Sequence, residues 1–216
     1  MYIIDTSYFI KNINVPNTKE LQSGNTTQLE MYIDQYVREC LKSALGYELF
    51  KDLDQYVIDG VFNANENAPQ KWLDFVFGKE YEKNNQLMKW QGLYYTEGLF
   101  KNSLLAKYVF YHWYKDNVTT LSSIGEVNLQ AKNAVTAEPN QRLVSVWNEF
   151  VYEYQYKQTM NASNLNIYFI HGIPVYDWFT QNGNNFVSLL QFLTDNKENY
   201  ENATMKEYKY QNQFGL

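Results

Sequence analysis

Three stretches of the chain place apolar side chains three and four residues apart, the spacing that buries one face of a helix. They cover residues 29–45, about 97–116, and 138 to about 158. Thr27 and Glu30 have the spacing of a capping box, which predicts that the first helix begins at Thr27. We therefore expect a mainly α fold, a single-domain helical bundle with three longer helices, small β-hairpins and a long extended loop between helices.

Shorter elements are predicted between and after these helices. They are helices over 47–59, 69–78 and 185–193, a polar loop over 61–68 and a β-hairpin over 80–90. Gly60 and Gly78 end the first two of these helices, because glycine is a common residue just past a helix. Asn84 and Asn85 lie at the centre of the expected hairpin, and asparagine tolerates the left-handed backbone of a tight turn.

The organisation of the chain follows from where these patterns stop. We expect an irregular N-terminal arm (1–25), a helical domain (26–193) with an inserted loop or hairpin (119–137), and a polar tyrosine-rich tail (194–216). The inserted loop and the tail lack the apolar period of a self-sufficient element, so we expect both to be ordered mainly by partners. The candidate interface anchors are Ile124, Val127, Leu129, Tyr208, Tyr210 and Phe214.

Composition and charge exclude several classes of protein. The formal net charge of -6 argues against a general nucleic-acid binder, which carries a basic stripe. A single cysteine, Cys40, excludes a disulfide scaffold and a cysteine-rich zinc site, and it fits a reducing compartment. No apolar run is long enough to cross a membrane, and the first residues are not typical of a secretory signal. We expect an intracellular protein that does not associate with a membrane.

The motifs of common nucleotide-, metal- and nucleophile-dependent enzymes are absent from the sequence. We therefore predict no catalytic residue, no metal site and no cofactor. The two histidines, His112 and His171, and the lone Cys40 are interpreted as packing residues. Glu149 and Glu153 lie four residues apart on one helix face, which we interpret as solvated, because a metal there needs further ligands opposite.

Aromatic residues make up 18% of the chain, and Tyr108, Phe110, Tyr111, Trp113 and Tyr114 all fall in one expected helix. Successive helix residues point about 100° apart, so these rings cannot all face one core. Aromatic side chains concentrate in the cores of interfaces. We favour an oligomer with wide lateral contacts over the alternative of a large core with some chance exposure.

Four segments carry a family resemblance through their order and combination. They are LEMYIDQYVRECLKSALGYELFKDL (Leu29–Leu53), FGKEYEKNNQLMKWQGL (Phe77–Leu93), KNSLLAKYVFYHWYKDN (Lys101–Asn117), and SSIGEVNLQAKNA (Ser122–Ala134) followed by VSVWNEFVYEY (Val144–Tyr154). In this order they resemble the opening helix, short hairpin, second long helix, and long loop with third helix of head–tail connector proteins of tailed bacteriophages. Within this family, the segments resemble the ring proteins of crAss-like gut phages, over about residues 20–160.

The resemblance implies a structural virion protein that is made in the host cytoplasm and is not an enzyme. Such proteins form a ring homo-oligomer, commonly a dodecamer, in the neck beneath the portal protein. The ring joins the portal to the next ring or tail protein and leaves a channel for DNA in transit. The net charge of -6 is compatible with that channel, because an acidic wall repels phosphate and lets DNA slide.

Two other functions stay open. Aromatic and acidic residues also suit a carbohydrate-binding or glycan-hydrolysing protein, whose carboxylates come from separate elements and leave no local motif. The third reading is a helical scaffold of unrelated origin. A glycan hydrolase is expected to bring two carboxylates together in a pocket, whereas a connector is expected to self-associate or to bind a portal.

Overall fold

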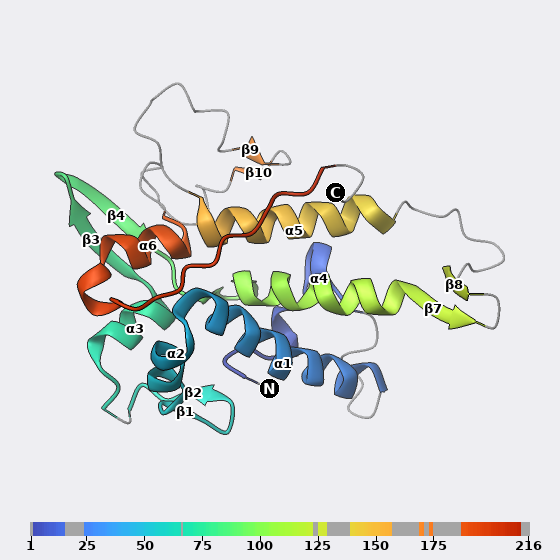
Figure 1. Cartoon of the computed structure of the whole chain (residues 1–216), viewed down its shortest axis with the longest axis horizontal. Helices are drawn as coiled ribbons and strands as arrows, with labels where there is room; N and C mark the ends of the chain where they lie inside the picture. The colour runs from blue at the N-terminus through green and yellow to red at the C-terminus, as the bar shows by residue number, and fades with distance from the viewer. Residues whose placement is uncertain are drawn as a thin grey trace.

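The computed structural model describes residues 2–15, 24–65, 67–122, 125–128, 139–156, 169–170, 173–174 and 187–212. Its long helices are α1 (Gly24–Leu45), α4 (Leu104–Val118) and α5 (Pro139–Gln155), and its short helices are α2 (Tyr47–Asp54), α3 (Gln70–Phe77) and α6 (Leu189–Asp195). The three long helices lie side by side, with α4 between α1 and α5 (Figure 1). The expected mainly α fold is confirmed.

Neighbouring long helices run antiparallel, and side-chain contacts fix their pairing. Near the N-terminus of α1, the Gln28 side-chain amide donates to Asn117 Oδ1 at the end of α4, at 2.9 Å. Further along, the Tyr108 hydroxyl on α4 donates to Glu39 on α1, also at 2.9 Å. Because α1 begins at Gly24, Thr27 lies one turn inside the helix and the capping-box prediction is wrong. A capping pattern marks where a helix can begin, and tertiary packing selects among such points.

Small antiparallel hairpins surround the helices. The strand pairs are β1 (Val57–Ile58) with β2 (Val61–Phe62), β3 (Lys79–Lys83) with β4 (Gln86–Trp90), β5 (Tyr94–Glu97) with β6 (Phe100–Ser103), β7 (Thr119–Ser122) with β8 (Gly125–Asn128), and β9 (Phe169–Ile170) with β10 (Ile173–Pro174). The β3–β4 hairpin confirms the prediction for residues 80–90. Its turn has Asn84 and Asn85 at φ of 52° and 59°, the left-handed pair that a two-residue type I′ turn requires.

Two helix boundaries differ from the expected ones because hairpins take over the ends. The second helix ends at Asp54 rather than 59, and Asp59 and Gly60, both at positive φ, form the β1–β2 turn instead. The helix expected from 97 begins only at Leu104, because the preceding residues pair as β5 and β6 around Gly98. The predicted short helix is confirmed as α3, which starts after Pro69 and ends at Gly78.

The N-terminal arm contributes to the core. Residues 2–15 contain two single 3-10 turns, η1 (Thr6–Tyr8) and η2 (Lys11–Ile13). The arm buries the apolar side chains of Tyr2, Ile4, Tyr8, Phe9, Ile13 and Val15. The Tyr2 hydroxyl donates to Asp54 at 2.7 Å, which ties the arm to α2. Although it has little regular structure, the arm is therefore part of the packed body.

α6 joins the β3–β4 hairpin to the helical body. The Ser188 hydroxyl caps α6 by accepting from the Gln191 N–H. The Trp90 ring stacks on Phe192, with ring centroids 5.6 Å apart and an interplanar angle of 19°. Both Tyr81 and Lys83 on the hairpin bind the Asp195 carboxylate at the end of α6. Among the described helices, none combines the length and apolar character needed to cross a membrane.

Candidate functional site

The inserted loop contributes a hairpin at the periphery of the molecule. β7 and β8 continue past the end of α4, beyond the helical layer (Figure 1). Val127, one of the predicted anchors, lies in β8 and pairs with Thr120 in β7. Ile124 and Leu129 lie outside the described residues, as do 130–138. The described part of this segment is a hairpin, which is one of the two conformations, loop or hairpin, that the sequence predicted.

The predicted tail anchors separate into an inward and an outward residue. Tyr208 is half-buried against Phe150 and Tyr154, with ring centroids 5.3 Å and 5.0 Å away. Burial raises the pKa of the Tyr208 phenol to about 12. Tyr210 is 49% exposed, and Phe214 lies outside the described residues. Residues 201–212 therefore lie on their own chain, which differs from the expectation that a partner orders the tail.

Some of the exposed apolar side chains lie at hairpin ends, whereas others, such as Met31 in α1 and Tyr47 in α2, lie on helices. Leu99 in the β5–β6 turn is 99% exposed, Val61 at the start of β2 is 67% exposed, and Leu87 in β4 is 57% exposed. Each follows a turn residue directly or within two positions, namely Gly98, Gly60 and Asn85. Sequence reasoning missed these three residues, although an apolar residue next to a turn was a usable signal. A single exposed leucine is common on protein surfaces, so these residues point to a contact surface only together with the open strand edges beside them.

A buried ion pair links α4 to α5 and replaces the solvated face expected for this part of α5. The Lys107 ammonium binds the Glu153 carboxylate and lies 4.0 Å from Glu149. Lys107 is 7% exposed and Glu153 is 8% exposed. The interpretation of Glu153 as a solvated residue is therefore wrong, because the packing of α4 against α5 covers it. Sequence periodicity could not show this, since the cation lies 46 residues earlier in the chain.

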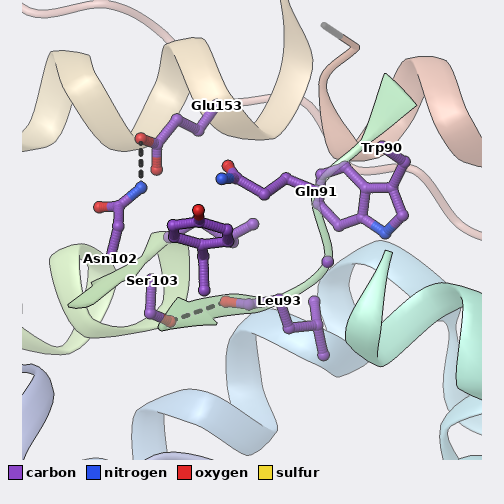
Figure 2. Close-up of a pocket in the computed structure, with 9 residues that line it drawn as sticks. Trp90, Gln91, Leu93, Asn102, Ser103 and Glu153 are labelled. Atoms are coloured by element: carbon purple, nitrogen blue, oxygen red, sulfur yellow. Dashed lines mark hydrogen bonds between the residues drawn. The ribbon is translucent and has the colours of Figure 1, made fainter. Parts of the chain in front are cut away.

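Figure 2 shows a small polar pocket, and Glu153 of this ion pair belongs to its lining. It is lined by Trp90, Gln91, Gly92, Leu93, Tyr95, Asn102, Ser103, Leu104 and Glu153. The Asn102 amide donates to Glu153 at 3.2 Å, and the Ser103 hydroxyl donates to the Leu93 carbonyl at 2.8 Å. The Gln91 side-chain nitrogen is buried without a hydrogen-bond partner. With a cavity volume of about 10 Å³, the pocket has room for about one water molecule.

This pocket offers little to the glycan-hydrolase alternative. The Glu149 and Glu153 carboxylates converge on one ammonium ion rather than on an open space. A cavity of about 10 Å³ admits no sugar ring. Within the described part of the chain, no three His, Cys, Asp or Glu side chains gather where they could hold a metal ion.

The remaining titratable residues named from the sequence are packing residues where they are described. Cys40 is fully buried, and burial raises the pKa of its thiol. His112 stacks on Tyr36, with ring centroids 4.1 Å apart and an interplanar angle of 11°. Its Nε2 atom is buried without a hydrogen-bond partner. His171 lies outside the described residues.

Comparisons with known proteins add no relative: no family model, no curated protein and no solved structure matches the chain.

Proposed function

We propose that the protein is a structural adaptor of a phage neck. In this proposal a single-domain helical bundle assembles into a ring that joins the portal protein to the next ring or tail protein. The ring surrounds a channel for DNA in transit. The chain acts through shape and surface burial, without a catalytic step. The family resemblance of residues 20–160 motivates the proposal, and the character of the surface supports it.

The exposed apolar side chains at the hairpin ends are the observation that carries the proposal. Leu99, Val61 and Leu87 leave apolar surface in water at the ends of two-stranded hairpins. The described hairpins are two-stranded sheets, so each has strand edges that no third described strand covers. Unpaired strand edges pair readily with another chain. This combination suits a body that binds neighbouring copies through projecting hairpins.

Co-expression with the portal protein of the same virus, followed by electron microscopy of the purified complex, tests the proposal. We expect closed rings of the chain bound to one end of the portal. A chain that stays monomeric and does not bind the portal would contradict the adaptor function. Binding or hydrolysis of glycans by that monomer would favour the carbohydrate alternative instead.

Substitution of Leu99 tests which surface drives assembly. Leu99→Asp places a charge where we expect an apolar contact, so the variant should fold normally but form no ring. Leu99→Met is the matched control, because it keeps an apolar side chain of similar volume at the same position. Equal assembly of the two variants in analytical ultracentrifugation would show that the β5–β6 turn lies outside the interface.

A further inference from the structure

The tail segment, which we define as residues 205–212, is held by side-chain amides of α5. The Gln155 amide nitrogen donates to the Tyr208 carbonyl, and the Tyr208 N–H donates back to Gln155 Oε1, both at 2.6 Å. Asn148 makes the same pair of bonds with Gln211, at 2.9 Å and 2.8 Å. Each amide therefore bonds the N–H and C=O of one tail residue, as a neighbouring strand would.

The spacing of the two amides matches an extended peptide. Asn148 and Gln155 are seven residues apart, which is about 10.5 Å along a helix. Tyr208 and Gln211 are three residues apart, which is about 10 Å in an extended chain. Between the two pairs, the Trp147 indole N–H donates to the Lys209 carbonyl at 2.8 Å. Side chains of α5 therefore form hydrogen bonds with the main chain of the tail segment at three residues, Tyr208, Lys209 and Gln211.

Backbone bonds to α1 hold the beginning of the tail segment. The N–H groups of Met205 and Lys206 donate to the carbonyls of Ala44 and Ser43 at the end of α1, at 2.8 Å and 3.1 Å. Figure 1 shows the tail crossing the helical layer from α6 and ending alongside α5. The groove that receives the segment therefore runs from the end of α1 to the middle of α5.

One side chain anchors the segment in register. The Tyr208 ring packs edge-on against Trp147, with centroids 5.6 Å apart and an interplanar angle of 89°, and also contacts the ring of Tyr108. Without the tail segment, the faces of these aromatic rings that contact Tyr208 would be exposed to solvent. Recognition thus combines a main-chain ladder, which accepts any extended peptide, with one aromatic pocket that selects the register.

The link between the segment and the body is short and exposed. Tyr200 is buried and its hydroxyl donates to the Lys71 carbonyl at 2.6 Å, so the body ends there. Residues 201–204 follow, with a turn at 201–202; Glu201, Asn202 and Thr204 are exposed and Ala203 is half-buried. Met205 then has a φ of 49°, which is unfavourable for a residue with a side chain. A chain that takes another path from residue 201 loses the contact of Ala203 with the core, and must regain those of Met205 and Tyr208 on the partner.

We propose that this groove is a peptide-binding site that also accepts the tail segment of a second copy of the chain. The segment and the groove are identical in every copy, so an exchanged tail makes the same amide pairs and fills the same aromatic pocket. Only the link at 201–204 changes, which is the usual low cost of exchanging an identical element between protomers. Four extended residues span about 14 Å at most, so the partner's groove must begin close to Tyr200.

Two full-length variants test the exchange, because they can form an intact pair only between copies. The first carries Asn148→Ala and Gln155→Ala, which break the groove and leave the tail segment intact. The second carries Tyr208→Ala, which breaks the anchor and leaves the groove intact. Both altered groove residues are half-buried polar side chains, so both variants should keep the helical content of the wild type in circular dichroism.

Made in a Leu99→Asp background, which removes the proposed ring contact, each variant alone should be monomeric with rapid amide exchange in residues 205–212. The equimolar mixture of differently tagged variants should co-purify, and the tail of the first variant should exchange about tenfold more slowly than alone. No co-purification and unchanged exchange would overturn the proposal. Co-purification of two tagged copies of the groove variant would also overturn it, because those copies lack an intact groove.

Tyr210→Ala supplies the matched control, since Tyr210 lies in the same tail but faces solvent. Mixed with the groove variant it should co-purify several-fold less than Tyr208→Ala does, because its own intact tail competes for its groove. Equal yields from the two tyrosine variants would remove Tyr208 as the anchor. No portal enters the experiment and the Leu99→Asp background removes the proposed ring contact, so its failure leaves the adaptor function standing, and failure of ring assembly leaves tail exchange standing.

Discussion

At the scale of single residues, the buried pair of Lys107 and Glu153 depends on both partners being present. Removing two charges from water is costly, and only their mutual attraction and added hydrogen bonds offset that cost. Asn102 supplies one such bond to Glu153, and Glu149 places a second carboxylate near the Lys107 ammonium. Loss of the lysine therefore leaves two carboxylates without their cation. Loss of Glu153 still leaves the Glu149 carboxylate near the Lys107 ammonium.

Lys107→Met should lower the free energy of unfolding by about 3–5 kcal/mol, the usual cost of an uncompensated buried charge. Glu153→Leu should cost less, and the double variant should recover most of the loss. Urea titrations of the three variants measure these differences. A Lys107→Met cost below about 1 kcal/mol would mean that the pair behaves like an exposed salt bridge.

Trp147 combines packing with recognition of the tail segment. It is 9% exposed, contacts the Tyr111 ring at 4.4 Å, and donates to the Lys209 carbonyl. Trp147→Ala should cost about 3–5 kcal/mol in a urea titration, because it removes a large buried ring. Trp147→Phe keeps most of the packing and loses the hydrogen bond, so it should cost about 1 kcal/mol. Equal costs would show that the hydrogen bond, not the ring, carries the stability.

His112 should make stability depend on pH. Burial lowers the pKa of its imidazole, although the nearby carboxylates of Glu39 and Asp116 act in the opposite direction. In the unfolded chain the group protonates at about pH 6.5. The unfolded state therefore binds more protons below that pH, and stability is lost as the pH falls from about 6.5 toward the lower pKa of the folded state.

His112→Phe keeps a ring against Tyr36 and removes this titration. The free energy of unfolding should therefore fall less between pH 7 and 5 in the variant than in the wild type, as measured by urea titrations at each pH. Carboxylates contribute equally to both proteins, so the difference between the curves isolates His112. Parallel curves would show that the imidazole titrates alike in the folded and unfolded states.

At the scale of elements, two glycines let α3 and β4 meet. Gly78 ends α3 and Gly92 follows β4, at φ of 98° and 95°. A Cβ on Gly92 would lie 2.5 Å from the Val76 carbonyl oxygen, and one on Gly78 would lie 2.6 Å from the Trp90 carbonyl oxygen. The Leu93 N–H donates to the Val76 carbonyl at 2.9 Å across this contact. The close approach of the two backbones positions the β3–β4 hairpin against α6.

Gly92→Ala should destabilise the protein by well over 1 kcal/mol, since it adds both backbone strain and a clash with main-chain atoms. Gly98→Ala is the matched control, because Gly98 has a φ of 57° and no atom within 4 Å of the added Cβ. Its cost should be limited to the strain, about 1 kcal/mol. Similar thermal midpoints for the two variants would show that the α3–β4 contact yields without cost.

At the scale of the whole molecule, the helical body and the projecting loop are expected to have separate roles. Deleting residues 122–134 removes β8 but leaves the aromatic packing between α4 and α5, such as the contact of Tyr108 with Phe150 at 4.9 Å. The deletion variant should keep its helical content and melt cooperatively, but should not enter the ring. Circular dichroism and electron microscopy with the portal measure the two properties. Complete rings from the deletion variant would show that this loop is not a lateral clasp.

The sequence by itself determined the elements whose signals are local. Helical periodicity predicted the long helices, Pro69 and Gly78 bounded α3, and Asn84 with Asn85 placed a hairpin turn. These patterns work because backbone preference and the alternation of apolar residues act within a few positions. Where two local signals competed, at residues 55–62 and 94–103, the hairpins replaced the predicted helical turns.

Only the tertiary structure decided which polar groups are buried together and where the tail lies. Lys107 and Glu153 are 46 residues apart in the sequence, and Tyr208 and Gln155 are 53 residues apart, yet each pair is in contact. Such pairs leave no periodic trace, because each partner alone has the pattern of a solvated residue. The tail segment has no apolar period of its own, yet amides on α5 satisfy its backbone and one tyrosine fills an aromatic pocket. Its order arises from long-range contacts that a linear pattern does not record.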